Sequence, residues 1–565
     1  MCPGSTTRLW WKTWNSPSPP RTNAGPNRSG SGHWRWRSSN NFWGRGPGAV
    51  GPGPPPTSHI ERSLMRVGFS HFLAAIFSGL VMAAAFPKWD YNFLLPVGLI
   101  PLLWAIRGKS RNAAFWLGLV SGLAFYCGLL YWIVYVTTVF GGLPVLLGVG
   151  VLLVLAGYLS LYRALWALGV NWAAARGHSL MWFAPAFWVA LELGQTYIIS
   201  GFPWEVLGNG AYRFPLLLQL ADITGVYGLS FLLALVNVSL FVMLVADQGR
   251  GPRFRHLSVV AVLVLVWVGY GHYRLGEVDQ RMAQAPKMKV AVVQGNIKQG
   301  DKWKKEMVQT TLERYGELTR QVKGARLVVW PETAAPFFFL RTPQFSAQVQ
   351  EIAKESRAYL LFGAPAWELT PQGETFFNRA YMLSPQGEVV GYYDKAHLVP
   401  YGEYVPLKRY LPFLGKMVSM VGDFAEGPVG KVVDLPEGPV GPLICYESIF
   451  PYLSRPQVEN GARLLVNITN DAWYGTTSAP HQSLAIAVVR SVESHVAMAR
   501  AANTGISAFI DPAGRILWQS GLFVPAAEAM DLPLLTGGTL YTRYGDWFAW
   551  LCVILAGLTL ILPRR

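Results

Sequence analysis

The sequence predicts a bundle of membrane-spanning helices joined to a soluble α/β or α+β sandwich. The chain of 565 residues is 52% hydrophobic and only 14% charged, whereas soluble domains carry about one quarter charged residues. Long apolar runs fill the first half of the chain and its end. Between them, from Met288 to about Leu535, short apolar runs alternate with amphipathic segments, as in a sandwich of strands and helices.

Eight apolar runs predict about eight membrane spans. A helix needs about 20 apolar residues to cross the hydrocarbon core of a bilayer, and the second run is short enough to be tilted or partly re-entrant. The runs are Phe69–Phe86, Phe93–Ile106, Phe115–Phe140, Leu143–Leu168, Trp182–Ile199, Tyr227–Ala246, Leu257–Tyr270 and Phe548–Leu562.

Basic residues predict the orientation of these spans, because Lys and Arg favour the cytoplasmic ends of membrane helices. They cluster after the second, fourth, sixth and eighth runs, at Arg107–Arg111, Arg176, Arg250–Arg255 and Arg564-Arg565. An even-numbered topology puts all four positions on one side of the membrane. We therefore expect the stretch between the seventh and eighth spans on the other side, which is the periplasm in a bacterial cell.

One acidic residue, Glu192, falls inside the fifth apolar run. A carboxylate inside a membrane is costly and is a functional candidate by default. A satisfied carboxylate near the end of the helix is an equally good interpretation, and the sequence leaves both open. Because ion pathways usually contain several such residues, the isolated acid argues against a transporter.

The first 64 residues differ from the rest of the chain. They hold eight basic residues against Glu61 alone, are rich in Pro, Gly, Ser and Trp, and contain no apolar run of signal-peptide length. Nucleic-acid binding would require a folded basic module, and none is visible. We expect a disordered extension, or a start site placed upstream of the natural one near Met65, and no nucleic-acid partner.

Hydrophobic periodicity locates the elements of the sandwich. Helices are expected over Lys304–Val322 and Gln482–Ala502, and Ser384–Gly387 has the residues of a hairpin turn. The expected strands are Val290–Val293, Leu327–Trp330, Tyr359–Phe362, Asn378–Leu383, Val389–Tyr393, Leu443-Ile444, Leu464–Val466 and Ile506–Ile510.

Three reactive side chains follow expected strands, which is where open α/β sheets commonly place their chemistry. Cys445 ends the apolar run Gly441–Ile444 and is the only cysteine of the soluble stretch. It has no disulfide partner there and is a candidate nucleophile. Glu332 and Lys395 each follow another strand of the same domain.

These three groups suffice for acyl transfer through a thioester. A thiol is only a few per cent ionised at neutral pH, so a carboxylate such as Glu332 is needed to take its proton. The oxyanion of the attacked carbonyl can be stabilised by Lys395 and by the backbone N–H of Tyr446, each by about 3 kcal/mol. Taken singly, the acid would be an ordinary loop residue and the lysine an ordinary surface residue.

The motifs around these residues resemble those of the carbon–nitrogen hydrolase (nitrilase) superfamily. Those similar to its Glu-Lys-Cys signature are Trp330-Pro331-Glu332, Tyr393-Asp394-Lys395 with His397–Glu403, Ile444–Glu447 and Asn467–Gly475. Together with the surrounding spans, the chain from Met65 onward resembles the bacterial apolipoprotein N-acyltransferase family. The resemblance implies that the soluble part is a nitrilase-like αββα sandwich.

The resemblance also implies residue roles. Glu332 is expected as the general base, Lys395 as the oxyanion stabiliser and Cys445 as the acylated nucleophile. The supporting positions that match are Glu403, which would hold the lysine, Trp303, Tyr446 and Glu447, which would shape the pocket, Trp204 in the aromatic loop Ser200–Glu205, and, more loosely, Asn378.

The implied reaction has two steps. Cys445 takes an acyl chain from a phospholipid, usually phosphatidylethanolamine, and passes it to the α-amine of a lipoprotein's diacylglyceryl-cysteine. Because thioester to amide is downhill, no cofactor is expected; the sequence has neither a phosphate-binding loop nor a His/Cys metal-ligand cluster. Two alternatives stay open: a membrane-tethered amidase with water as acceptor, and a non-enzymatic lipid-binding protein.

The expected organisation places the protein in the bacterial inner membrane, and nothing in the sequence demands more than a monomer. Apolar loop segments at Phe337–Leu340, Phe413-Leu414 and Met417–Val421 would dip toward the lipid and gate access, or else pack within the domain. The expected parts are the extension 1–64, a helical domain 65–275 with about seven spans, a periplasmic catalytic domain 286–535 and a C-terminal span 546–563.

Overall fold

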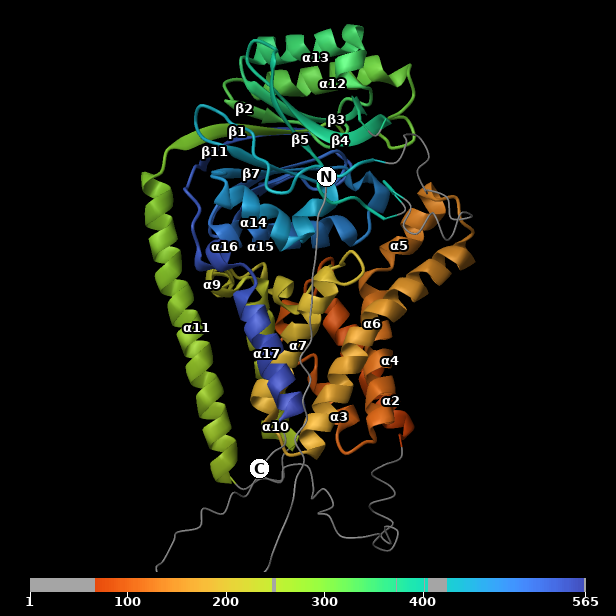
Figure 1. The fold of residues 1–565 in the computed structure, drawn as a ribbon, viewed down its shortest axis with the longest axis vertical. Coiled ribbons are helices and arrows are strands. Elements are labelled where there is room, and N and C mark those ends of the chain that lie inside the picture. Colours follow the sequence, from red (N-terminus) through yellow and green to blue (C-terminus); the bar gives the residue numbers. More distant parts are fainter. Residues whose placement is uncertain (1–66, 246–249, 372, 401, 405–423, 563–565) are drawn as a thin grey trace, which may run out of the picture. The chain divides into compact units, whose positions relative to one another are not determined.

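The computed structural model describes residues 67–245, 250–371, 373–400, 402–404 and 424–562, with side chains left out at 245–257 (Figure 1). The described residues belong to one compact unit, Asn41–Arg565. The predicted extension 1–64 lies outside the described residues. So do the apolar loop segments Phe413-Leu414 and Met417–Val421.

The N-terminal half is helical, and one further helix closes the described chain. Apart from short 3-10 and π-helical turns, its helices are α2 (Phe69–Ala84), α3 (Ile100–Ile106), α4 (Arg111–Leu129), α5 (Trp132–Tyr135), α6 (Val145–Ala175), α7 (Leu180–Tyr197), α8 (Pro215–Leu218), α9 (Ala221–Thr224), α10 (Val226–Val245), α11 (Arg250–Gln284) and α17 (Trp547–Ile561).

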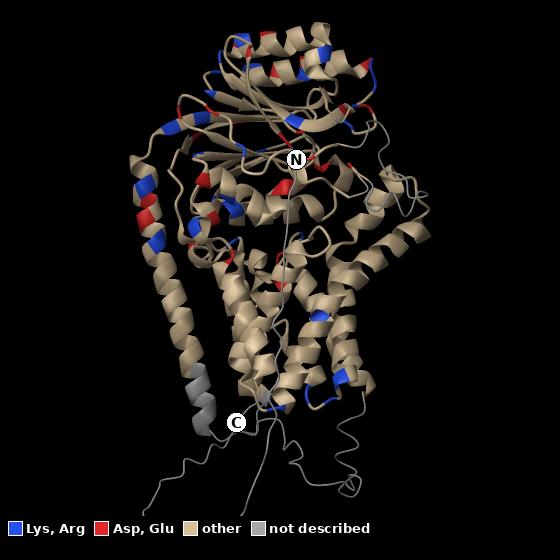
Figure 2. Cartoon of the chain, viewed as in Figure 1, with Lys and Arg blue, Asp and Glu red and all other residues tan. Residues whose placement is uncertain are grey.

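Each of the eight apolar runs contains a helix, but two runs differ from a single span. The second holds only the short α3, and the third breaks at Leu130, beyond which α5 and the π-helical turn Val136–Phe140 follow. Among the described helices, four are long and apolar enough to cross a membrane by length and composition. Charged residues are few on these helices, apart from the end of α11 next to the sandwich, and are frequent on the sandwich (Figure 2).

Small residues bring α4 and α6 close together. Gly118 and Gly122 lie four residues apart on α4, which is the spacing that lets helix backbones approach in membranes. A Cβ atom at Gly122 would lie 2.7 Å from the Cβ of Ser160 on α6, and one at Gly118 would lie 2.6 Å from that of Ala167. Only glycine fits at these two positions.

The remaining elements form the sandwich, which follows directly on α11. They are β1 (Lys287–Gln294), α12 (Met307–Gln321), β2 (Leu327–Val329), α13 (Pro343–Ser356), β3 (Tyr359–Thr370), β4 (Gly373–Leu383), β5 (Val389–Asp394), β6 (Val440–Ile444), α14 (Pro451–Glu459), β7 (Leu464–Thr469), α15 (Ala479–Ser494), β8 (Ala497–Ala502), β9 (Ala508–Ile510), β10 (Ile516–Gln519), β11 (Ala526–Pro533) and α16 (Leu540–Tyr544).

Two sheets stack between two layers of helices (Figure 1). The six-stranded sheet has the order β11-β1-β2-β3-β4-β5 and the five-stranded sheet the order β10-β9-β8-β7-β6. Strands β1, β2 and β3 are parallel, as are β6, β7 and β8. Helices α12 and α13 cover the first sheet, and α14 and α15 cover the second (Figure 1). This is the predicted αββα sandwich.

Alternating side chains on the strands build the two cores of the sandwich. On β1, Val290 and Val292 face the second sheet, whereas Ala291 and Val293 join the cluster under α12 and α13. This period of two is the geometry of a pleated strand buried on both faces. The strands therefore end at fixed positions, and the residues that follow them are held by both cores.

One local prediction is wrong, and one open alternative is decided in part. The helix expected over Gln482–Ala502 is α15, which ends at Ser494; His495 then adopts a left-handed conformation with φ of 51°, and Ala497–Ala502 form the buried strand β8. In the segment Phe337–Leu340, for which lipid contact and packing within the domain were both open, Phe337 and Phe339 are 9% and 1% exposed and pack in the core beneath α12 and α13, whereas Leu340 is 62% exposed. The alternative of packing within the domain holds for both rings.

We predict that Gly122→Leu destabilises the helical part, because the new side chain must push α4 away from α6. Overpacking of this kind costs about 1–3 kcal/mol, which corresponds to a melting temperature lower by about 5 °C. Thermal unfolding of the detergent-solubilised protein measures this melting temperature. Gly157→Leu on α6 is the matched control, since no atom lies within 4 Å of a Cβ there. Equal melting temperatures for the two variants would contradict the close contact.

Candidate active site

A lysine lies between two carboxylates where the first sheet ends. Lys395, directly after β5, places its Nζ 2.9 Å from Glu403 and 3.8 Å from Glu332 Oε1. The amide of Asn378 on β4 donates to both acids, over 2.7 Å to Glu332 and 2.8 Å to Glu403. The backbone N–H of Asn470 donates to the other oxygen of Glu332 over 3.1 Å. Four predicted residues thus form one hydrogen-bonded cluster.

The backbone around Glu332 depends on a glycine of the neighbouring strand. A Cβ at Gly363 on β3 would lie 2.5 Å from the nitrogen of Thr333 and 2.7 Å from the Cα of Glu332. Thr333 itself adopts a left-handed conformation with φ of 50°, which is uncommon for a β-branched residue. The turn after β2 therefore holds the carboxylate by close backbone contact.

Cys445 lies at the end of β6, in the facing sheet. It begins the 3-10 turn Cys445–Ile449 and has a φ of 55°, a conformation that costs a non-glycine residue free energy and recurs at functional sites. The fully buried Glu447 holds this turn: it accepts the N–H groups of Ile444 at 2.6 Å and Ala396 at 2.6 Å and the hydroxyl of Tyr393 at 2.9 Å. Glu447 thereby joins the cysteine turn to the lysine loop.

Burial and neighbouring charges set the protonation states. Burial and the charge of Glu332 raise the pKa of Cys445 to about 12, and Lys395 only partly offsets them. Burial lowers the pKa of Lys395, but Glu403 and Glu332 outweigh it and raise that pKa above its ordinary value. Burial raises the pKa of Glu447 to about 7. The resting site therefore holds a protonated thiol beside a permanent ammonium.

A second ammonium lies at this site, and the sequence did not single it out. Lys302 is 1% exposed and donates to the backbone carbonyl of Glu332 over 2.9 Å. Burial lowers its pKa to about 8, although the charges of Glu332 and Cys445 act in the opposite direction. The only signal was its place beside Trp303, a predicted site residue that is partly exposed on the same loop.

Tyr446 and Trp204 connect the thiol to the helical part. The Tyr446 hydroxyl donates to the carbonyl of Gly201 over 3.4 Å, and its ring centre lies 6.3 Å from that of Phe202. Trp204 is 2% exposed and donates to Gln482 of α15 over 2.8 Å. It is thus a buried contact with the catalytic domain and does not anchor the chain at a lipid surface. Sequence reasoning did not identify Gln482.

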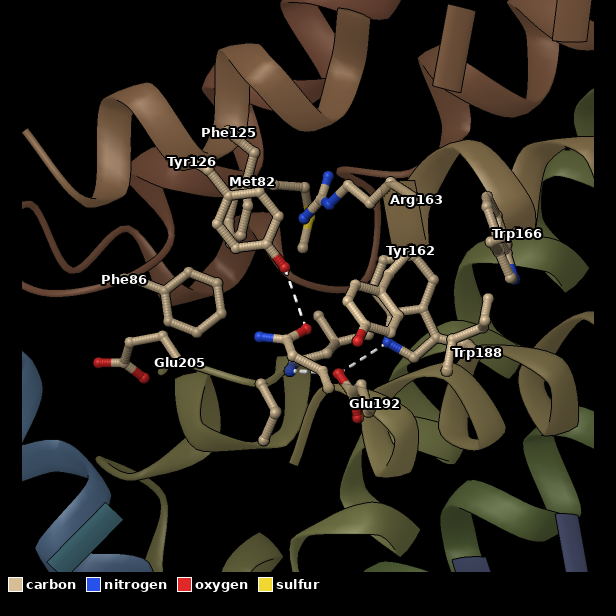
Figure 3. Close-up of a pocket in the computed structure, with 14 residues that line it drawn as sticks. Met82, Phe86, Phe125, Tyr126, Tyr162, Arg163, Trp166, Trp188, Glu192 and Glu205 are labelled. Carbon is tan, nitrogen blue, oxygen red and sulfur yellow. Dashed lines mark hydrogen bonds between the residues drawn. The ribbon is translucent and has the colours of Figure 1, made fainter. Parts of the chain in front are cut away.

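Glu192 anchors the loop that carries Trp204. Its Oε1 accepts the indole N–H of Trp188 over 2.8 Å and the N–H of Leu207 over 2.7 Å. With Arg163 it lines a cavity of about 30 Å³ inside the helical part (Figure 3). Its Oε1 thus holds the outer loop, whereas its buried Oε2 has no hydrogen-bond partner, so the contacts leave both interpretations of this acid open. Among the described residues, no group of three or more His, Cys, Asp or Glu could hold a metal ion.

Comparison with known proteins places the chain in a family. The profile of the carbon–nitrogen hydrolases matches residues 289–525, and that of the apolipoprotein N-acyltransferase N-terminal domain matches residues 78–239. A curated apolipoprotein N-acyltransferase from Geobacter metallireducens is 44% identical over 500 residues, which are 87% of this chain and 95% of that protein. One from Methylococcus capsulatus is 33% identical over 507 residues, with 87% and 96% covered.

Among solved structures, an amidase from Nesterenkonia sp. aligns at 21% identity and a TM-score of 0.35, over 47% of this chain and 96% of that chain. The fold and the family match to residues 289–525 define a carbon–nitrogen hydrolase domain, carried here on a set of apolar helices. The identity over most of the length defines it further: the chain belongs to the apolipoprotein N-acyltransferase family. The predictions of fold class, family and an acyltransferase enzyme are confirmed.

We predict that Glu332→Gln alkylates faster at Cys445 than the unaltered protein, although it should be inactive. The substitution removes the charge that helps to raise the pKa of the thiol, and a fall of one pKa unit increases the thiolate fraction about tenfold. Lys395→Met removes the ammonium that lowers the pKa of the thiol, and it should therefore slow alkylation. Iodoacetamide labelling at pH 8, followed by peptide mass spectrometry, measures both rates.

The surface variant Glu313→Gln on α12 is the control and should label like the unaltered protein. A slower rate in Glu332→Gln would contradict the proposed electrostatic relation between this acid and the thiol.

Proposed function

We propose that this protein transfers an acyl chain from a membrane phospholipid, by way of a thioester on Cys445, to the α-amine of an S-diacylglyceryl-cysteine at the N-terminus of apolipoproteins. The single observation that supports it most is the buried Glu332–Lys395–Glu403 cluster facing the strained turn of Cys445. Family membership supports the lipoprotein acceptor, and phosphatidylethanolamine is the donor we propose.

In the first step Glu332 takes the thiol proton as Cys445 Sγ attacks the donor's ester carbonyl. The oxyanion is stabilised by the Lys395 ammonium and the N–H of Tyr446. The C–O bond then breaks, the protonated Glu332 returns the proton to the departing alkoxide, and a lysophospholipid leaves. A thiol whose pKa is raised to about 12 needs such a base.

In the second step the free amine attacks the thioester carbonyl. Glu332 now takes a proton from the amine, the C–S bond breaks, and that proton restores the thiol. The same ammonium and N–H serve this second oxyanion. No group outside the two substrates is consumed, so the proposed reaction requires no cofactor.

The competing function is hydrolysis, with water in place of the amine. The tight contact between the catalytic domain and the helical part favours transfer, since a buried site excludes water while acyl chains reach it from the bilayer. Tyr446, next to the thiol, packs against Phe202 and bonds Gly201 of the helical part. A hydrolase would have no need for this seal.

We predict that the purified protein, incubated with phosphatidylethanolamine vesicles, gains the mass of one acyl group on Cys445. A synthetic diacylglyceryl-cysteine peptide should discharge it and appear as the N-acyl peptide, whereas buffer alone should leave the adduct for hours. Intact and peptide mass spectrometry measures each species. Cys445→Ser is the control and should gain no thioester.

An adduct that buffer removes as fast as the peptide does would favour the amidase. No adduct from any phospholipid would favour a non-enzymatic lipid-binding protein.

We further propose that the catalytic domain faces the periplasm from the inner membrane, as the positions of the basic clusters indicate. A membrane-impermeant maleimide should then label Lys323→Cys, exposed after α12, in intact spheroplasts. It should label Ser179→Cys, exposed between α6 and α7, only after the membrane is permeabilised. The reverse pattern would invert the proposed orientation.

A further inference from the structure

Gln482 of the catalytic domain is inserted among segments of the helical part. It lies in the first turn of α15 and is 1% exposed. Its Oε1 accepts the indole N–H groups of Trp204 over 2.8 Å and Trp132 over 3.2 Å. Its Nε2 donates to the carbonyls of Pro87 over 3.0 Å and Leu129 over 3.1 Å.

These four contacts use the full hydrogen-bonding capacity of a glutamine side chain, which is two donors and two accepting lone pairs. The partners lie at the outer ends of α2 and α4, on α5, and in the loop after α7. One side chain thus fixes four separate segments of the helical part against α15. A methionine of similar length would keep the volume and lose all four bonds.

The two indoles held by Gln482 belong to a continuous aromatic surface, formed by Trp132, Trp204, Phe202, Tyr474 and Tyr446. Their neighbouring ring centres are 4.9 Å apart for Trp132 and Trp204 and 5.0 Å apart for Trp132 and Tyr474. Those of Phe202 and Trp204 are 5.8 Å apart, and those of Phe202 and Tyr446 are 6.3 Å apart. The surface combines rings from the helical part and the catalytic domain.

This aromatic surface ends at the reactive thiol. Tyr446 follows Cys445 in the chain. Burial raises the pKa of the Tyr474 phenol, and an ionised Cys445 would raise it further. The other end of the surface is carried by α5 and by the loop before Leu207, which belong to the helical part. A continuous row of packed rings therefore runs from the helical part to the residue next to Cys445.

We propose that Gln482 is a positioning residue for acyl transfer: it holds Trp132 and Trp204 in the orientation in which the aromatic surface receives the acyl chain of the donor. The proposal rests on the proposed function, because it takes a long apolar chain as the group delivered to Cys445. Gln482 itself does not touch the reacting atoms. It acts through the two indoles, so its loss affects long chains and spares short ones.

The chain offers a matched control in Gln219. This residue is also a fully buried glutamine that ties the helical part to the catalytic domain, by donating to the carbonyls of Pro215 over 2.8 Å and Ala513 over 3.0 Å. Its hydrogen-bond partners do not belong to the aromatic surface. A general loosening of the two parts would follow from changing either glutamine, but only Gln482 should alter chain selection.

The test uses full-length protein in nanodiscs and two activated esters, p-nitrophenyl butyrate and p-nitrophenyl palmitate. Attack by Cys445 forms the thioester and releases nitrophenolate, and the thiol proton passes to Glu332 and then to solvent. The initial burst of nitrophenolate reports the kcat and KM of acylation. The variants are Gln482→Met, Gln482→Glu and Gln219→Met.

We expect the unaltered protein to prefer palmitate. Gln482→Met should lose about tenfold in kcat/KM for palmitate, mainly through KM, and less than about twofold for butyrate, because lost positioning bonds act only on the chain that they align. Gln482→Glu should not recover the loss, because its second carboxyl oxygen would face the carbonyls of Pro87 and Leu129, which only accept hydrogen bonds. Gln219→Met should behave like the unaltered protein with both esters.

Equal losses with both esters, no loss with either, or no preference for palmitate in the unaltered protein would each overturn the inference. Its failure is distinguishable from failure of the proposed function. If the unaltered protein takes palmitate from the ester but from no phospholipid, the proposed donor is wrong while the role of Gln482 stands.

Discussion

The charge pairing of Lys395 with Glu332 and Glu403 is the interaction on which the rest of the site depends. An ammonium 1% exposed is tolerable only with charged partners and hydrogen bonds. Here two carboxylates share it, and Asn378 donates to both of them. One base can thus stay bound to the lysine while the other exchanges protons. Glu332 closely follows β2, whereas Glu403 lies in the loop after β5 and is held by the amide of Asn378 and the N–H of Val399.

The same arrangement explains why the thiol rests in its protonated form. Burial works against a thiolate, and the charge of Glu332 adds to that effect. Nucleophile and base are therefore coupled: Cys445 becomes reactive when Glu332 accepts its proton, which requires a substrate carbonyl in place. Lys302, whose pKa burial lowers to about 8, adds a second cationic group beside Glu332 without the two-acid pairing of Lys395.

Sequence reasoning located the motifs that end strands, and it failed where tertiary packing decides. Glu332, Lys395 and Cys445 follow β2, β5 and β6, because apolar runs mark buried strands and the polar residue after each run marks its end. By contrast, β8 (Ala497–Ala502) consists mostly of alanine, which suits a helix as well as a buried strand. Its pairing with β7 settles the conformation.

Gln482 shows the same limit at the level of function. Nothing in the local sequence distinguishes a glutamine in a first helical turn from a solvated one, since its partners lie about 280 to 395 positions away in the chain. They meet because the catalytic domain docks α15 onto the ends of the membrane helices. For the reaction proposed above, that docking would meet two requirements together: an apolar route for an acyl chain and a thioester shielded from water until an amine arrives. Gln482 makes these four hydrogen bonds with an uncharged side chain, so it joins the catalytic domain to the helical part without burying a charge between them.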